Sequence, residues 1–119
     1  MEGEAGLVSR AVRNAARQGI ANVSYVTADL AAPATDAPWA KRPYDRVLLD
    51  PPRAGAREAL SVVGGCGASR VVYISCHPGS LARDAGILVR DHGFRLVAAG
   101  VMDMFPHTTH VEAMAVFER

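Results

Sequence analysis

Short runs of β-branched and aromatic residues alternate along this chain with longer segments whose apolar residues recur at helical spacing. This alternation predicts strands joined by crossover helices, and such units build a parallel, doubly wound sheet. A length of 119 residues and a hydrophobic content of 50% suffice for one buried core. We therefore expect a single α/β domain.

Apolar periodicity and turn residues divide the chain into strands and helices. The expected elements are a helix over Ala5–Gln18, a strand over Asn22–Ala28, a loop over Leu30–Pro43 with one turn near Trp39, a strand over Tyr44–Asp50, a helix over Ala56–Val63, a strand over Arg70–Ser75, a helix over Gly79–His92, and strands over Phe94–Met102 and Val111–Phe117. No helical segment separates the last two strands, so they are expected to pair antiparallel around the loop Asp103–His110.

Reactive side chains stand at the carboxyl ends of three expected strands, namely Asp29, Asp50 and Cys76. The carboxyl ends of parallel strands meet at one edge of a sheet, where α/β proteins bind their ligands. We therefore expect the functional site at this edge.

The strand that ends at Asp50 continues as Pro51-Pro52-Arg53. This tetrapeptide resembles the fourth motif of base-modifying methyltransferases, in which the next residue is usually aromatic and stacks on a flipped base. Arg53 would instead hold a phosphate or a uracil carbonyl. An ordinary turn with a capping aspartate is an equally good interpretation of the tetrapeptide alone.

Cys76 precedes His77-Pro78 and a predicted helix, and a helix N-terminus favours the thiolate form of a nearby cysteine. A lone cysteine is more often buried and inert, which is how we interpret Cys66 among its glycines. Two cysteines without CxxC spacing fit neither a disulfide framework nor a cysteine-ligated metal, and they favour a reducing, cytoplasmic location. No apolar run reaches the roughly 18 residues of a membrane span.

The polar segment that starts at Asp103 holds His107, His110 and Glu112. These side chains could ligate a metal, but the segment lacks the helical HExxH spacing and no further ligand cluster supports such a site. We favour Glu112 as a base, with the histidines shaping its pocket, and we expect no metal.

Together these segments resemble the RNA uracil-C5-methyltransferases, and within them the bacterial enzymes that modify 23S ribosomal RNA rather than transfer RNA. The matching residues are Val47–Gly55, Tyr73–Cys76 with Pro78 and Leu81–Asp84, and Asp103–Thr108 with His110–Glu112. The resemblance covers essentially the whole chain. It implies the C-terminal part of a Rossmann-like S-adenosylmethionine-dependent methyltransferase sheet that ends in an antiparallel hairpin.

The resemblance also implies roles for single residues. Cys76 would be the nucleophile and Glu112 the base that removes the C5 proton, while Arg53 and His110 would contact the RNA substrate. Glu2 would bind the ribose of S-adenosylmethionine, Asp29 would approach its adenine, and Asp50 would lie against the same pocket. The chain departs from the family at His77, where Asn is usual, and at Ser80, where Thr is usual.

Other parts of the family's architecture would precede Glu2: the first strand with its glycine-rich cofactor loop, an RNA-binding domain and, in many members, a cysteine-ligated iron–sulfur cluster. Residues 1–119 are therefore expected to be a partial catalytic domain that is inactive alone. Without the first strands the sheet has a gap, so Asn22–Ala28 would pair beside Tyr44–Leu49, detach, or be exchanged between two chains in a dimer.

Two other functions remain open. A non-catalytic RNA-binding or scaffold remnant would fit the net charge of +1, although the retained Cys76 and Glu112 argue against it. A Cys–His thiol hydrolase built on Cys76 would need an oxyanion pocket and no methyl donor.

Overall fold

The computed structural model describes residues 1–33, 35–104, 107–108 and 110–119. Its elements are α1 (Ala5–Arg17), α2 (Pro38–Lys41), β1 (Arg46–Leu49), a 3-10 turn η1 (Arg57–Ala59), α3 (Leu60–Gly65), β2 (Arg70–Ser75), α4 (Pro78–His92), β3 (Arg95–Met102) and β4 (Glu112–Glu118). Apart from the strand expected over Asn22–Ala28, every predicted element is confirmed to within a few residues.

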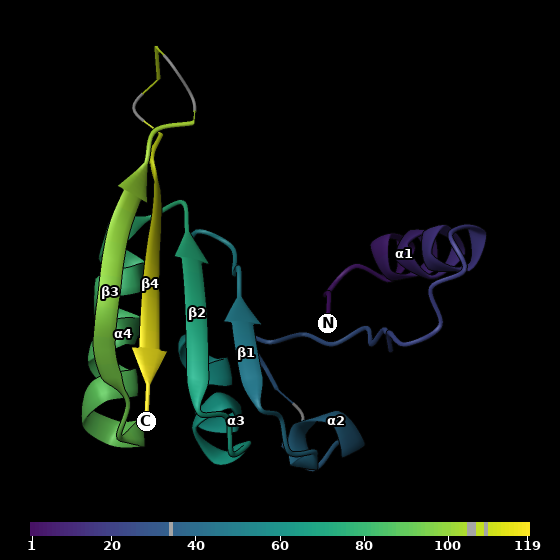
Figure 1. Ribbon diagram of the computed structural model, residues 1–119, viewed down its shortest axis with the longest axis horizontal. Helices are drawn as coiled ribbons and strands as arrows, with labels where there is room; N and C mark the ends of the chain where they lie inside the picture. The colour runs from purple at the N-terminus through teal and green to yellow at the C-terminus, as the bar shows by residue number, and fades with distance from the viewer. Residues whose placement is uncertain (34, 105–106, 109) are drawn as a thin grey trace.

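The strands form one sheet in the order β1-β2-β4-β3 (Figure 1). β1 and β2 are parallel, whereas β4 pairs antiparallel with both β2 and β3. The predicted antiparallel hairpin at the end of the sheet is therefore confirmed. Phe105, Pro106 and Thr109 of its connecting loop lie outside the described residues.

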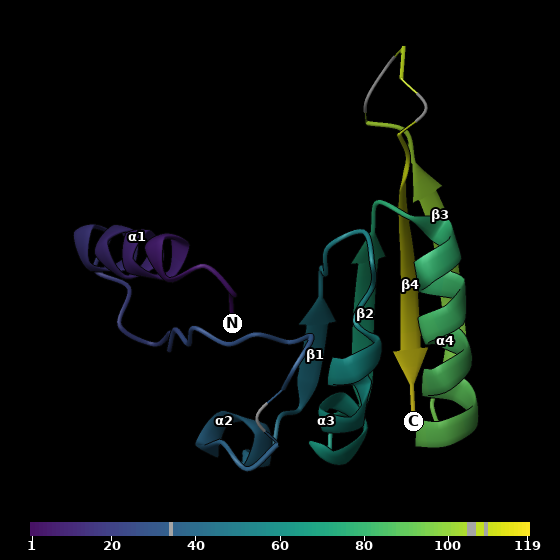
Figure 2. The same ribbon diagram turned by 180° about the vertical axis from the view of Figure 1, so that it is seen from behind.

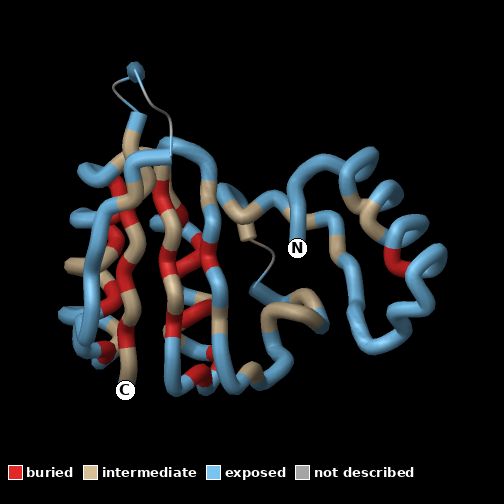
Figure 3. Tube along the Cα trace, turned by 45° about the horizontal axis from the view of Figure 1, so that its top comes forward, coloured by how far each residue is buried: buried red, intermediate tan, exposed pale blue. Residues whose placement is uncertain are grey.

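Helices α3 and α4 lie on the same face of the sheet, behind it in Figure 1 and in front of it in Figure 2. The core between the helices and the sheet includes the fully buried side chains of Tyr73, Phe117 and Leu60, and Figure 3 shows the buried positions gathered there. The other face is open, and Leu48 and Val101 on the strands are each 66% exposed. The described helices thus cover one face, not both as a doubly wound sheet requires.

The segment Asn22–Ala28 is not a strand of the sheet, and the prediction of a strand there is wrong. It forms one isolated parallel bridge, between Thr27 and Glu2, while β1 is the edge of the sheet. α1 and this segment lie beyond that edge in Figures 1 and 2. β-branched residues alone do not make a strand, because strand stability comes from neighbours across the ladder.

Helix α4 has well-defined ends, and its first residues follow directly on the end of β2. The His77 side chain accepts a hydrogen bond from the Ser80 backbone N–H at 3.1 Å, which satisfies a donor that the first turn leaves open. Gly93 ends the helix in the left-handed conformation with φ 69°. No helix of the described residues is long and apolar enough to cross a membrane.

Candidate functional site

The pairing of β2 with β4 determines where Cys76 and Glu112 lie. Ser75 is the register partner of Ala113. One step further along both strands, the next residues are Cys76 and Glu112. Residues directly opposite each other on antiparallel strands have Cβ atoms about 4.5–5.5 Å apart. Cys76 and Glu112 are both half-buried, which leaves each accessible to a small substrate.

Side-chain alternation puts both residues on the open face of the sheet. Val71, Tyr73 and Ser75 of β2 and Ala113, Ala115 and Phe117 of β4 are the buried positions that face the helices. Residues at the intervening positions point to the opposite face. Glu112 belongs to these, and Cys76 joins them when the alternation continues for one residue.

Asp50 follows the same rule on β1. Leu49 is buried toward the helices and pairs with Tyr73 in parallel register. Asp50 is the next residue, so the alternation directs it to the open face, at the edge where Cys76 lies. Continued by one residue past the ends of β1 and β2, the alternation therefore predicts Asp50 and Cys76 at the edge and on the face of the sheet where Glu112 lies.

A cavity of about 390 Å³ lies between the N-terminal segment and β1 with the loop and helix that follow it. Glu2, Asp29 and Asp50 all line it, among apolar residues such as Leu30 and Pro51. Glu2 accepts a hydrogen bond from the Glu4 N–H at 3.1 Å and Asp29 one from the Ala31 N–H at 2.9 Å. These bonds orient two carboxylates at an apolar cleft, and carboxylate acceptors fit the hydroxyl and amino donors of a nucleoside.

Two predicted substrate residues, Arg53 and His110, are exposed and do not line this cavity, although both chain neighbours of Arg53 do. Arg53 lies in the tight turn that the Gly55 N–H closes on the Pro52 carbonyl at 2.8 Å. The His110 N–H donates to the Thr108 hydroxyl at 3.2 Å. Across the described residues there is no group of three or more side chains suited to hold a metal.

The two cysteines have different environments: Cys66 is buried, as the sequence suggested, and Cys76 is half-buried. Cys66 is buried, and its thiol donates to the Val63 carbonyl at 3.1 Å. Both cysteines are free. Cys66 therefore has the contacts of a structural thiol, whereas Cys76 stands at a strand end.

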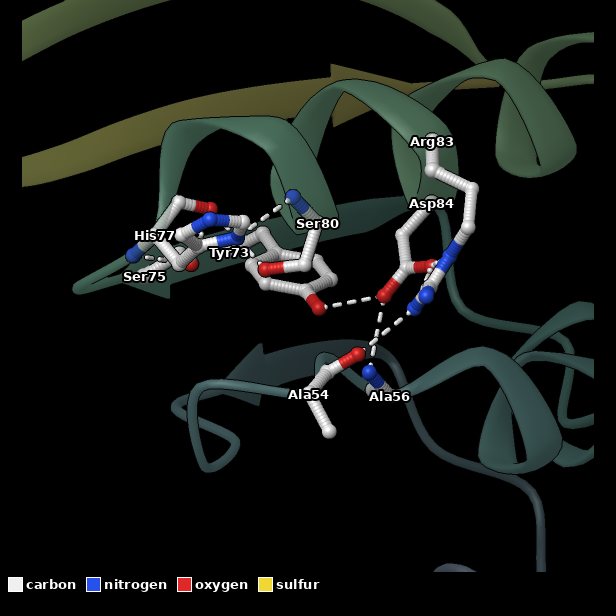
Figure 4. Close-up of polar contacts among 8 residues, drawn as sticks. All are labelled: Ala54, Ala56, Tyr73, Ser75, His77, Ser80, Arg83 and Asp84. Carbon is white, nitrogen blue, oxygen red and sulfur yellow. Dashed lines mark hydrogen bonds and ion pairs between the residues drawn. The ribbon is translucent and has the colours of Figure 1, made fainter.

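A buried polar network surrounds Asp84 (Figure 4), and the sequence did not predict it. Asp84 has no exposed surface, and its carboxylate accepts hydrogen bonds from the Tyr73 hydroxyl at 2.5 Å and the Ala56 N–H at 2.7 Å. Burial raises the pKa of Tyr73 well above its ordinary value, and the hydrogen bond and negative charge of Asp84 raise that pKa further. The spacing of Asp84 from Leu81 and Leu88, the buried stripe of α4, was the signal available in the sequence.

Residues 36–119 match the model of the tRNA (uracil-5-)-methyltransferase family. The match includes Asp50, Cys76 and Glu112. The chain belongs to this family. Within the uracil methyltransferases it is 60% identical over 119 residues to the 23S rRNA (uracil(1939)-C(5))-methyltransferase RlmD of Alkalilimnicola ehrlichii, and 59% identical to that of Methylococcus capsulatus.

The chain spans 27% of the length of those two relatives, and the matches cover all 119 of its residues. A crystal structure of Pyrococcus abyssi tRNA (uracil-54, C5)-methyltransferase in complex with S-adenosyl-L-homocysteine superposes with a TM-score of 0.76 and 27% identity, over 97% of this chain and 26% of that one. M. jannaschii TYW2 in complex with AdoMet superposes with a TM-score of 0.66 at 16% identity, over 98% of this chain and 55% of that one. The latter similarity concerns the fold alone.

Proposed function

We propose that residues 1–119 are part of the catalytic domain of an S-adenosylmethionine-dependent enzyme that methylates uracil C5 in RNA. The observation that supports this proposal is the β2–β4 register, whose last pair is Ser75 with Ala113, so that one further step along both strands would bring Cys76 opposite Glu112. A thiol and a carboxylate at that separation can act on adjacent carbons of one pyrimidine ring.

The proposed chemistry uses Cys76 first and Glu112 last. The Cys76 thiolate attacks C6 of the uracil and forms a C6–S bond, which turns the ring into an enolate with a nucleophilic C5. S-adenosylmethionine, when bound, would supply the methyl group that C5 takes, and the bond between that methyl group and the cofactor's sulfur would break. Glu112 then takes the proton from C5, the C5–C6 double bond returns, and the C6–S bond breaks to release the Cys76 thiolate.

The remaining site residues would bind and orient. Glu2 and Asp29 would accept hydrogen bonds from the cofactor's ribose and adenine, with Asp50 at the same cavity, because all three carboxylates line it. Arg53 would hold a phosphate or a uracil carbonyl and His110 would contact the target, since both are exposed near the same edge. We place the enzyme in the cytoplasm, where its RNA substrate and two free cysteines fit.

We favour 23S ribosomal RNA over transfer RNA as the substrate. The support is the 60% identity to a 23S rRNA methyltransferase, against 27% to a tRNA methyltransferase of known structure. Incubation with separate 23S rRNA and tRNA transcripts, followed by nucleoside analysis for 5-methyluridine, distinguishes the two. Methylation of the tRNA alone would contradict this choice.

The test uses a full-length hybrid enzyme in which these 119 residues replace the matching segment of the Alkalilimnicola ehrlichii relative. RNA that carries 5-fluorouridine should trap a covalent complex with the hybrid, because fluorine at C5 cannot be removed as a proton. Cys76→Ala should abolish the complex, while Cys66→Ala, the matched control at a structural thiol, should keep it. Glu112→Gln should form the adduct on ordinary RNA but not turn over.

Two results would contradict the proposal. A complex that persists in Cys76→Ala would show that another residue is the nucleophile. A folded hybrid that forms no complex at all would favour the alternative, a non-catalytic RNA-binding or scaffold remnant of the same fold.

A further inference from the structure

Asp84 is the only charged side chain without exposed surface among the described residues. Its Oδ1 accepts a hydrogen bond from the Arg83 Nε at 2.8 Å and forms an ion pair with the Arg83 Nη2 at 2.7 Å. Its Oδ2 accepts the Tyr73 hydroxyl and the Ala56 N–H. One carboxylate of α4 is therefore bonded to β2 and to the loop that follows β1, as Figure 4 shows.

A gain in stability alone does not explain why a charged carboxylate is buried at this position. Burial of a carboxylate carries a desolvation cost that its partners offset only in part, and apolar replacements of buried ion pairs are often neutral or stabilising. What a hydrogen-bonded charge provides and an apolar side chain does not is a fixed direction for each partner. The partners of Asp84 therefore indicate what it holds in place.

The loop Pro51–Ala56 is held against this carboxylate more closely than a side chain would allow. Gly55 has φ +91°, and a Cβ on it would lie 2.5 Å from the Arg83 Nη2 and 2.6 Å from the Asp84 Oδ2. The Arg83 Nη2 also donates to the Ala54 carbonyl at 2.8 Å. Ala54 and Ala56 are thus hydrogen-bonded to Arg83 and Asp84, and Gly55 packs closely against both between them.

Both ends of the network lead to the proposed catalytic groups. Arg53 lies within the loop Pro51–Ala56, directly before Ala54, and this loop begins just after Asp50. Tyr73 precedes Cys76 by three positions on the chain, and α4 begins two positions after Cys76. The network therefore connects the segment that carries the nucleophile with the segment that carries the substrate residue.

We propose that Asp84 is a positioning residue that sets the Pro51–Ala56 loop relative to Cys76, so that the target base is presented to the thiolate. This inference rests on the proposed function. A misplacement of about 1 Å at a reacting centre costs up to about 100-fold in rate. Asp84→Asn keeps one acceptor, and Asp84→Ala keeps none, so the rate of attack should fall in the order Asp, Asn, Ala.

The test is single-turnover adduct formation by the hybrid enzyme, with 5-fluorouridine RNA at saturation. The amplitude reports the folded, competent fraction, and the rate constant reports the positioning of the base. Asp84→Asn should lower the rate constant at least about tenfold, with RNA affinity changed by less than about twofold because phosphate contacts dominate that affinity. Gly55→Ala, which disturbs the contact from the loop side, should give the same result.

Asp91→Asn is the matched control, since Asp91 is exposed on the same helix, and it should react at the parent rate. A lower amplitude with an unchanged rate constant in Asp84→Asn and Gly55→Ala would overturn the inference and leave Asp84 a purely structural role. The proposed function would survive that outcome, because it depends on the loss of the adduct in Cys76→Ala.

Discussion

Tyr73→Phe removes a single oxygen from the core and should lower the stability of the chain in a manner that depends on pH. The Tyr73 side chain has no exposed surface, and its hydroxyl donates to the Asp84 carboxylate at 2.5 Å. Hydrogen bonds to charged groups contribute about 1.5–3 kcal/mol. Asp84 keeps Arg83 and the Ala56 N–H in the variant, so we expect a loss within this range at pH 7.

The same hydroxyl gives the wild-type chain a dependence on alkaline pH. Burial, with Asp84 adding to it, raises the folded-state pKa of Tyr73 above the ordinary value of 10.0. The folded chain then retains a proton that the unfolded chain loses above about pH 10. This contribution to the free energy of unfolding is full below that pH and should fall by about 1.4 kcal/mol per pH unit above it.

Urea unfolding followed by far-UV circular dichroism between pH 7 and pH 11 measures both effects. The stability difference between wild type and Tyr73→Phe should be constant up to about pH 10 and then narrow. Tyr25→Phe, at an exposed tyrosine, is the matched control and should change neither value. If Tyr73→Phe is as stable as wild type at pH 7, or if the two pH profiles run parallel to pH 11, the reasoning about this hydrogen bond is refuted.

His77→Ala should lower the free energy of unfolding by about 0.5–2 kcal/mol because α4 loses its N-cap acceptor, and His77→Asn should largely restore it in the same urea titration. Gly93→Ala should cost about 1–2 kcal/mol in thermal unfolding, since φ is +69°. Gly65→Ala, with equal space but no positive φ, should cost less. Calorimetric titration of the 119-residue chain with S-adenosylmethionine should detect no micromolar binding, because Glu2 and Asp29 are exposed and a glycine-rich loop would have to complete the pocket; micromolar binding would contradict this.

Elements with a strong local signal could be predicted from the sequence. The run Arg70–Ser75 is β-branched and aromatic, and it is the strand β2 with the same bounds. The helix before Gly93 ends where expected because glycine accepts the left-handed conformation there. The edge of the sheet at which Asp50 and Cys76 lie could be predicted from the strand ends alone, because the carboxyl ends of parallel strands meet at one edge.

The features that the sequence did not predict correctly depend on contacts with residues far away in the chain. Asn22–Ala28 has the composition of a strand, but a ladder needs a neighbour that its residues do not specify. Asp84 stood in a motif that the resemblance quoted, yet its role depends on Tyr73 and on the loop after β1. The site roles of Glu2, Asp29, Arg53 and His110 stay predictions.

The position of β4 between β2 and β3 has a consequence for folding during synthesis. β2 pairs with β1, which is translated before it, and with β4, but not with β3, so one edge of β2 stays unpaired until β4 has been translated. Pairings between segments far apart in sequence form slowly because the intervening chain must first be ordered. Since β4 also carries Glu112, the nascent protein would hold the proposed nucleophile Cys76 without its proposed base until this late step, and the proposed chemistry would begin only once the sheet is complete.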